Sequence, residues 1–76
     1  MNLSEAKEGQ SVIVTGFTAD LKIRRRLQDL GMIKGTEIKC LSHSPMGDPT
    51  AYLIRRAVIA IRQIDAKEVL VREVEL

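Results

Sequence analysis

The chain has 76 residues, of which 45% are hydrophobic and 29% charged, with a formal net charge of +2. This length allows one domain, and the mildly basic balance suits an acidic protein surface or weak attraction to polyanions. Cys40 is the only cysteine, so an intrachain disulfide is excluded and a reducing compartment is favoured. The longest apolar run, residues 57–61, is far shorter than the roughly 20 residues that span a bilayer. Charges at Glu5 and Lys7 argue against a signal peptide, so we expect one cytosolic domain over residues 1–76.

The chain begins with signals for a helical turn and a strand. Residues 4–9 resemble a single helical turn that is capped by Ser4 and ended by Gly9. Residues 12–14 are all β-branched, which predicts a strand that ends at Gly16.

A helix is expected next. Asp20 is a suitable N-cap for a helix that continues to about Leu30, and Gly31 is suited to end it. Ile23, Leu27 and Leu30 recur at helical spacing, which predicts one stripe that faces the core.

The rest of the chain predicts short strands with short connections. In order, we expect a strand at 36–43 with Ile38 and Cys40 on one face, a loop at 44–49, strands at 50–55 and 57–62 joined by a tight turn near Arg55-Arg56, a helical turn at 63–67 and a strand at 69–74. Five short strands and one helix indicate a mainly β fold. A closed or nearly closed β-barrel is favoured, because closure removes the exposed edges that a small sheet cannot otherwise hide.

Several short motifs are spread over nearly the whole chain: Arg26-Leu27, Leu30-Gly31, Gly35, Ser44-Pro45-Met46-Gly47-Asp48-Pro49, Ala60-Ile61-Arg62 and Ala66. In this combination they resemble the ferrous iron transport protein A (FeoA) family. The resemblance implies a small SH3-like β-barrel with one short α-helix, similar to the C-terminal domain of iron-dependent repressors. Two positions depart from the family pattern: Lys34 stands where proline is usual, and Arg56 where many members have glycine.

The resemblance also implies a function. It indicates a non-enzymatic accessory protein of bacterial ferrous iron uptake that has no cofactor. The expected partner is the ferrous iron permease FeoB, a membrane protein with a cytosolic GTP-binding domain. Contact with the membrane is expected only through that partner, and the chain is expected to be a monomer or a weak homo-oligomer.

Metal-binding and catalytic residues are scarce. Cys40 and His43 are the only soft metal ligands. Residues three apart along a strand point to opposite faces, so the two cannot share an ion without a bulge. Cys40 lies beside Ile38 on its face and is expected in the core. With one histidine, on the face opposite the cysteine, no nucleophile–base pair can be assembled. We therefore expect neither a native metal site nor a catalytic site.

A small basic RNA-binding barrel is the alternative function. Its basis is the cluster of four basic residues Lys22, Arg24, Arg25 and Arg26. RNA-binding barrels normally add aromatic stacking platforms, and this chain has only Phe17 and Tyr52. The cluster is interpreted as a solvated helix face or as a partner contact, and no nucleic-acid partner is expected.

Apolar residues in predicted turns are the candidates for partner binding. Met46 lies between Pro45 and Gly47, where a polar residue would be usual, and a flexible, polarizable methionine suits an adaptable contact. Met32 and Ile33 follow the predicted helix; they either contact the partner or fold back over the mouth of the barrel. The expected partner-binding residues are Met46, Met32, Ile33, Arg24 and Arg25.

Overall fold

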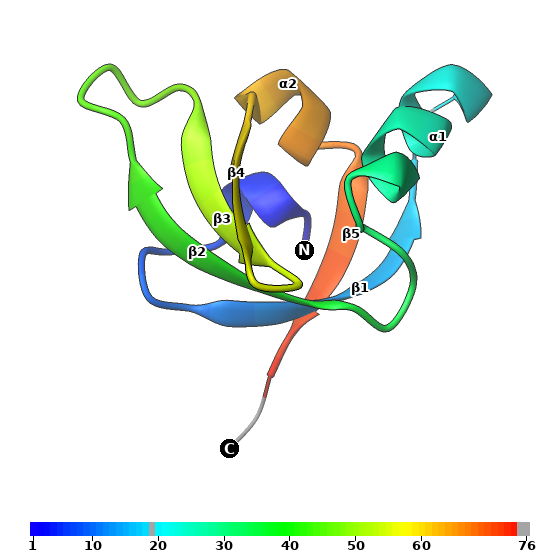
Figure 1. Cartoon of the computed structure of the whole chain (residues 1–76), viewed down its shortest axis with the longest axis horizontal. Helices are drawn as coiled ribbons and strands as arrows, with labels where there is room; N and C mark the ends of the chain where they lie inside the picture. The colour runs from blue at the N-terminus through cyan, green and yellow to red at the C-terminus, as the bar shows by residue number, and fades with distance from the viewer. Residues whose placement is uncertain (19, 75–76) are drawn as a thin grey trace.

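The structure of the chain, a computed structural model, describes residues 1–18 and 20–74. Five antiparallel strands form one sheet in the order β4-β3-β2-β1-β5. The elements in chain order are the 3₁₀ turn η1 (Leu3–Glu5), β1 (Ser11–Phe17), α1 (Leu21–Asp29), β2 (Glu37–His43), β3 (Thr50–Ile54), β4 (Ala57–Ile61), α2 (Gln63–Ala66) and β5 (Val69–Glu73) (Figure 1).

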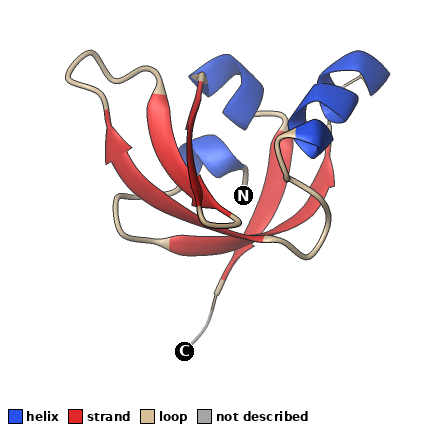
Figure 2. Cartoon of the chain, viewed as in Figure 1, coloured by secondary structure: helices blue, strands red, loops and turns tan. Residues whose placement is uncertain are grey.

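The sheet is strongly curved, and α1 and α2 lie along its open side (Figure 2). β4 and β5 form the two edges, so the sheet does not close on itself. The predicted mainly β fold with about five strands and one longer helix is confirmed, whereas full closure is not reached. Among the described residues, no helix is long and apolar enough to cross a membrane.

The core fills the inside of the curved sheet and is almost entirely aliphatic. Ile38 and Cys40 on β2 are both fully buried, as their alternation predicts. Tyr52 on β3 is the largest fully buried side chain. The other buried hydrophobic residues are Leu3, Ala6, Val12, Val14, Leu27, Met32, Ile54, Ile61, Ala66, Val69 and Val71.

A bulge in β2 changes where His43 points. The pairing of β2 with β3 shifts between Cys40 and Ser42, so that Cys40 lies opposite Tyr52 and His43 lies opposite Thr50. Tyr52 and Thr50 are two apart on β3 and share one face. Cys40 and His43 therefore share the inward face, and the prediction that they lie on opposite faces is wrong. The extra residue of the bulge inverts the alternation.

The N-terminal turn begins earlier than predicted. Asn2, not Ser4, is the N-cap of η1: its side-chain oxygen accepts from the Ser4 N–H at 3.0 Å. In return, the Glu5 carboxylate accepts from the Asn2 N–H at 2.8 Å, which completes a capping box. β1 is also longer than predicted, because it continues through Gly16 to Phe17 with a register shift against β5.

Helix α1 has the predicted cap and only part of the predicted apolar stripe. The Asp20 carboxylate accepts from the Ile23 N–H at 3.1 Å, and Leu27 is fully buried. Leu30 does not join the core and is 39% exposed, because the chain leaves the helix there. Gly31 follows with φ of +103°, and a Cβ at this position would lie 3.2 Å from the Ile54 side chain. This close, left-handed turn favours glycine.

The hairpin between β3 and β4 has the predicted tight turn, and two residues form it. Arg55 and Arg56 have φ of 49° and 70°, and positive φ at both central residues is typical of a type I′ turn. Arginine replaces the asparagine–glycine pair that such turns favour, so the turn carries backbone strain.

Leu27→Ala is expected to lower the free energy of unfolding by about 2–5 kcal/mol, because it removes a fully buried side chain and leaves a cavity. Thermal and urea unfolding measure the change. Leu30→Ala is the matched control and is expected to cost far less, because that side chain is partly exposed. Equal midpoints for Leu27→Ala and the parent chain would place Leu27 outside the core.

Arg56→Gly is expected to raise the free energy of unfolding by about 1 kcal/mol, because glycine adopts the left-handed conformation without the Cβ clash. Arg56→Ala removes the same charge and keeps the Cβ, so it separates backbone strain from electrostatics. Equal gains from both variants in urea unfolding would show that charge, not strain, is relieved.

Candidate docking surface

The loop at residues 44–49, between β2 and β3, presents Met46 at its tip. The Ser44 N–H donates to the Pro49 carbonyl at 3.2 Å and closes the base of the loop. The Gly47 N–H donates to the Ser44 carbonyl at 2.8 Å, which makes a tight turn with Pro45 and Met46 at its centre. Met46 is 90% exposed. The predicted loop is confirmed, and its apolar tip projects into solvent.

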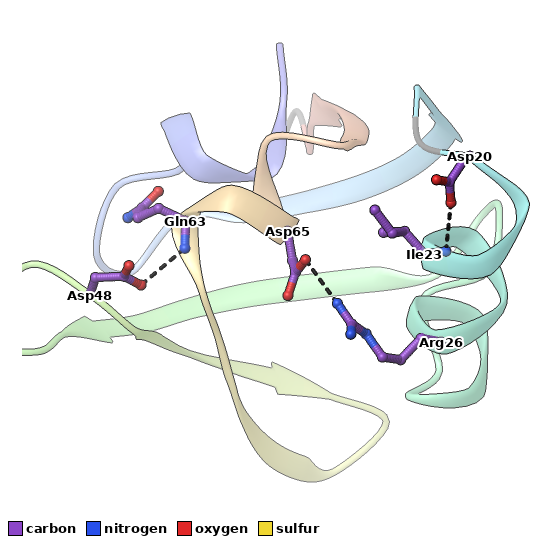
Figure 3. A network of polar contacts seen from close by, with 6 residues as sticks. All are labelled: Asp20, Ile23, Arg26, Asp48, Gln63 and Asp65. Carbon is purple, nitrogen blue, oxygen red and sulfur yellow. Dashed lines mark hydrogen bonds and ion pairs between the residues drawn. The ribbon is translucent and has the colours of Figure 1, made fainter.

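The same loop is fixed to α2. The Asp48 carboxylate accepts from the backbone N–H of Gln63 at 3.0 Å (Figure 3). The Gln63 side-chain amide donates to the Gly47 carbonyl at 3.4 Å and to the Thr50 hydroxyl at 3.3 Å. The N-cap of α2, Arg62, makes no side-chain capping bond, so Asp48 supplies the capping oxygen from another element. The tip is therefore carried by a tethered loop.

Helix α1 presents basic side chains. Arg24 and Arg25 are exposed. Arg26 forms an ion pair with Asp65 of α2 at 3.0 Å, with side chains 62% and 21% exposed (Figure 3). A pair this open to solvent stabilises weakly, by about 1 kcal/mol or less. It does orient α1 toward α2 and leaves the other two arginines available.

The two apolar residues after α1 have different positions. Met32 is fully buried, so its prediction as a partner-binding residue is corrected: it folds back into the core, and its N–H donates to the Leu27 carbonyl at 3.1 Å. Ile33 is 40% exposed and stays a candidate contact. The burial of Met32 and the exposure of Ile33 both depend on how the turn packs against the core. Neighbouring residues in the sequence do not show this packing.

A groove between α1 and the β4–α2 segment is a feature that sequence analysis missed. It has a volume of about 470 Å³ and is lined by Arg26, Leu27, Leu30, Ala60, Ile61, Arg62, Ile64 and Asp65. Ile64 is 71% exposed at its rim. The one indication of this surface in the sequence is that Ile64 is an apolar residue in the helical turn predicted at 63–67. The groove itself could not be found, because its walls are far apart in sequence.

The loop at 44–49, α2 and α1 lie along the same upper side of the molecule in Figure 1, with α2 between the other two. The longest dimension of the molecule is 31 Å. A standard interface covers about 800 Å² per partner, which is a patch about 30 Å across. One protein partner can therefore contact Met46 and the α1 arginines together.

Metal coordination finds little support in the geometry. Burial, and to a smaller degree the Glu8 carboxylate, raises the pKa of the Cys40 thiol, which disfavours the thiolate that binds metals. His43 Nδ1 lies 2.8 Å from the Thr50 hydroxyl. Although the bulge brings Cys40 and His43 to one face, residues 1–18 and 20–74 contain no group of three His, Cys, Asp or Glu that could hold an ion.

The aromatic residues are also unsuited to stacking on bases. Tyr52 is fully buried, and burial raises its pKa to about 12. Phe17 packs against the core. The basic helix therefore lacks the exposed aromatic platform that single-stranded RNA binding normally uses.

The whole chain resembles proteins of one family. The FeoA domain model matches residues 1–73. A FeoA protein from Chlorobium tepidum is 35% identical, with a TM-score of 0.90 over 99% of this chain and 71% of that chain. The zinc-complexed FeoA of Stenotrophomonas maltophilia, described as a prokaryotic SH3 domain protein, is 33% identical, with a TM-score of 0.82 over 95% of this chain and 89% of that chain.

A more distant similarity concerns the fold alone. The zinc-bound form of ScaR, a manganese-activated repressor, is 20% identical, with a TM-score of 0.85 over 97% of this chain and 37% of that chain. A comparison with curated proteins gives no match. Because the family model covers nearly the whole chain and FeoA structures superpose on it, the chain belongs to the FeoA family, whose SH3-like members have a role in ferrous iron transport.

Proposed function

We propose that this protein is a cytosolic, non-enzymatic accessory factor of bacterial ferrous iron uptake that docks on the cytosolic part of the permease FeoB and supports its transport. Membership of the FeoA family supports a role in ferrous iron uptake. The Stenotrophomonas maltophilia relative is described as a candidate ferrous iron transport activating factor. Docking as a monomer or weak homo-oligomer is part of the same proposal.

The observation that carries the proposal is the tethered loop with Met46 at its tip. The Met46 side chain is 90% exposed, so it does not pack in the core. The Asp48–Gln63 hydrogen bond of 3.0 Å holds the loop on α2. Holding a contact residue in place before binding reduces the entropy lost on association. The side chain itself stays adaptable, because methionine is unbranched and polarizable.

The basic end of α1 provides the second contact. Arg24 and Arg25 are exposed. Ile33, which follows the C-terminal end of α1, is 40% exposed and adds an apolar side chain to the surface. An acidic patch on the permease would be attracted to the arginines, which raises the association rate more than the affinity. Ile64 on α2, 71% exposed, lies on the element between the loop and α1 and gives the surface an apolar centre.

Met46→Asp is expected to weaken binding to the purified cytosolic part of FeoB by about tenfold or more, because it places a charge in a contact that excludes water. Permease-dependent iron uptake in cells should fall with it. The free energy of unfolding should stay within about 0.5 kcal/mol of that of the parent chain, as is usual for an exposed position.

Met46→Leu is the matched control, because it keeps the volume and apolar character and should retain binding and uptake. Normal binding and uptake with a stably folded Met46→Asp variant would exclude the loop as a docking element. A loss of fold would show that Met46 is structural, and the proposal would fail on that result too.

The monomer is not expected to bind ferrous iron tightly. The described residues offer no group of three suitable side chains, and the buried Cys40 thiol has a raised pKa. Anaerobic titration calorimetry with Fe(II) should show no stoichiometric binding at micromolar protein. Sub-micromolar, stoichiometric binding by the monomer would contradict this prediction.

A further inference from the structure

The two edges of the open sheet differ in whether another segment pairs with them. At the β5 edge, the N-terminal segment adds an extra pairing: the Val71 N–H donates to the Met1 carbonyl at 2.9 Å, and Asn2 bridges to Leu70. At the β4 edge, the sheet ends with β3 as the only neighbour. Within residues 1–18 and 20–74, β4 has no strand on its other side.

The register of the hairpin shows which backbone groups β4 leaves free. Ile54 and Ala57 flank the two-residue turn, so they form a hydrogen-bonded pair and the bonded pairs recur at every second residue. Ile59 is therefore bonded to β3, whereas the N–H and C=O groups of Val58 and Ala60 point away from it. In the part of the chain that the structure describes, these groups take part in no backbone–backbone hydrogen bond outside the sheet ladder.

This edge lacks the usual protection against strand addition. Natural edges carry charges, prolines or bulges, but Ala57–Ile61 is entirely apolar and pairs with β3 without a register shift. Val58 is 66% exposed on the outer face beside Leu53. On the other side, the groove next to Ala60 and Ile61 has a mixed lining, in which Leu27, Leu30 and Ile64 are apolar and Arg26, Arg62 and Asp65 are charged. A strand added here would therefore have apolar side chains within reach on both of its faces.

Positive charge brackets the edge. Arg55 and Arg56 form the turn before β4, and Arg62 follows it directly. All three are exposed and form no ion pair within the described residues. The groove lining contains one acidic residue among those described, Asp65, and it is paired with Arg26 at 3.0 Å.

These charges argue against a second copy of the chain as the occupant. In the register that overlaps the whole of Ala57–Ile61 in both copies, antiparallel pairing of two β4 edges would align Val58 of one copy with Ala60 of the other, so that Ile59 lies on the twofold axis. The same register sets Arg56 of one copy opposite Arg62 of the other, twice per dimer. Like charges directly opposite each other destabilise a strand pair.

We propose that the β4 edge is a peptide-binding site that adds an extended strand with about five apolar or β-branched residues between two acidic ones. Main-chain hydrogen bonds to Val58 and Ala60 hold the peptide, and its acidic ends meet Arg56 and Arg62. This site lies beyond the permease docking proposed above and does not depend on it.

The test uses a synthetic peptide, acetyl-Glu-Val-Thr-Val-Thr-Val-Glu-amide, added to ¹⁵N-labelled protein at low salt. The expected result is saturable binding with slowed hydrogen exchange at the Val58 and Ala60 amides. The matched peptide with lysine at both ends should bind about tenfold more weakly. Loss of the preference at high salt is expected, because these charges are exposed.

Ala60→Pro tests the main-chain bond. Proline removes an N–H that faces away from β3, which an edge strand tolerates, and it should weaken peptide binding by about tenfold or more. Ala60→Ser keeps the N–H and should bind as the parent does. Should Ala60→Pro not fold, the double variant Arg56→Glu, Arg62→Glu decides, because it should reverse the preference toward the lysine-ended peptide.

Four results of the peptide experiments would overturn the proposal. They are absence of binding by either peptide, binding that leaves exchange at Val58 and Ala60 unchanged, full affinity in a folded Ala60→Pro variant, and an unchanged peptide preference in the charge-reversed variant. Concentration-dependent dimers with protected β4 amides would overturn it as well, since the occupant would then be a second copy.

Discussion

Burial of Leu27 and Met32 inside the curved sheet holds α1 in place, and the other features depend on it. Both side chains belong to the single core cluster. A chain this small buries only about 60% of its unfolded surface, so each large aliphatic contact is a sizeable part of a stability on the order of 5 kcal/mol. With α1 fixed there, Arg24 and Arg25 face solvent, and the groove opens between α1 and the end of β4.

Features set by local chemistry could be predicted from the sequence. Asp20 caps α1 because its carboxylate reaches an N–H three residues on, and the Arg55-Arg56 turn is defined by the apolar strands on either side. The orientation of His43 could not be predicted, because the bulge in β2 is set by pairing with β3. Leu30 follows helical spacing and still leaves the core, because the chain turns away at that point.

The candidate surface divides in the same way. An apolar residue between turn residues identifies Met46 from sequence alone. Met32 and Ile33 are adjacent and equally apolar, and only their packing separates a core residue from an exposed one. Asp48 caps α2, a contact between segments that are distant in the sequence. The free edge of β4 follows from the order of the strands in the sheet. Neither feature can be recognised from a local sequence pattern.

We propose that the side of the molecule formed by the 44–49 loop, α2 and α1 contacts the permease. NMR of the ¹⁵N-labelled protein, titrated with the purified cytosolic part of FeoB, tests it most directly. We expect the amide signals of Met46, Gln63 and Ile64 and of the first turns of α1 to change or broaden together. Changes confined to the η1–β1 connection and the outer face of β1 and β2, with Met46 unaffected, would contradict it.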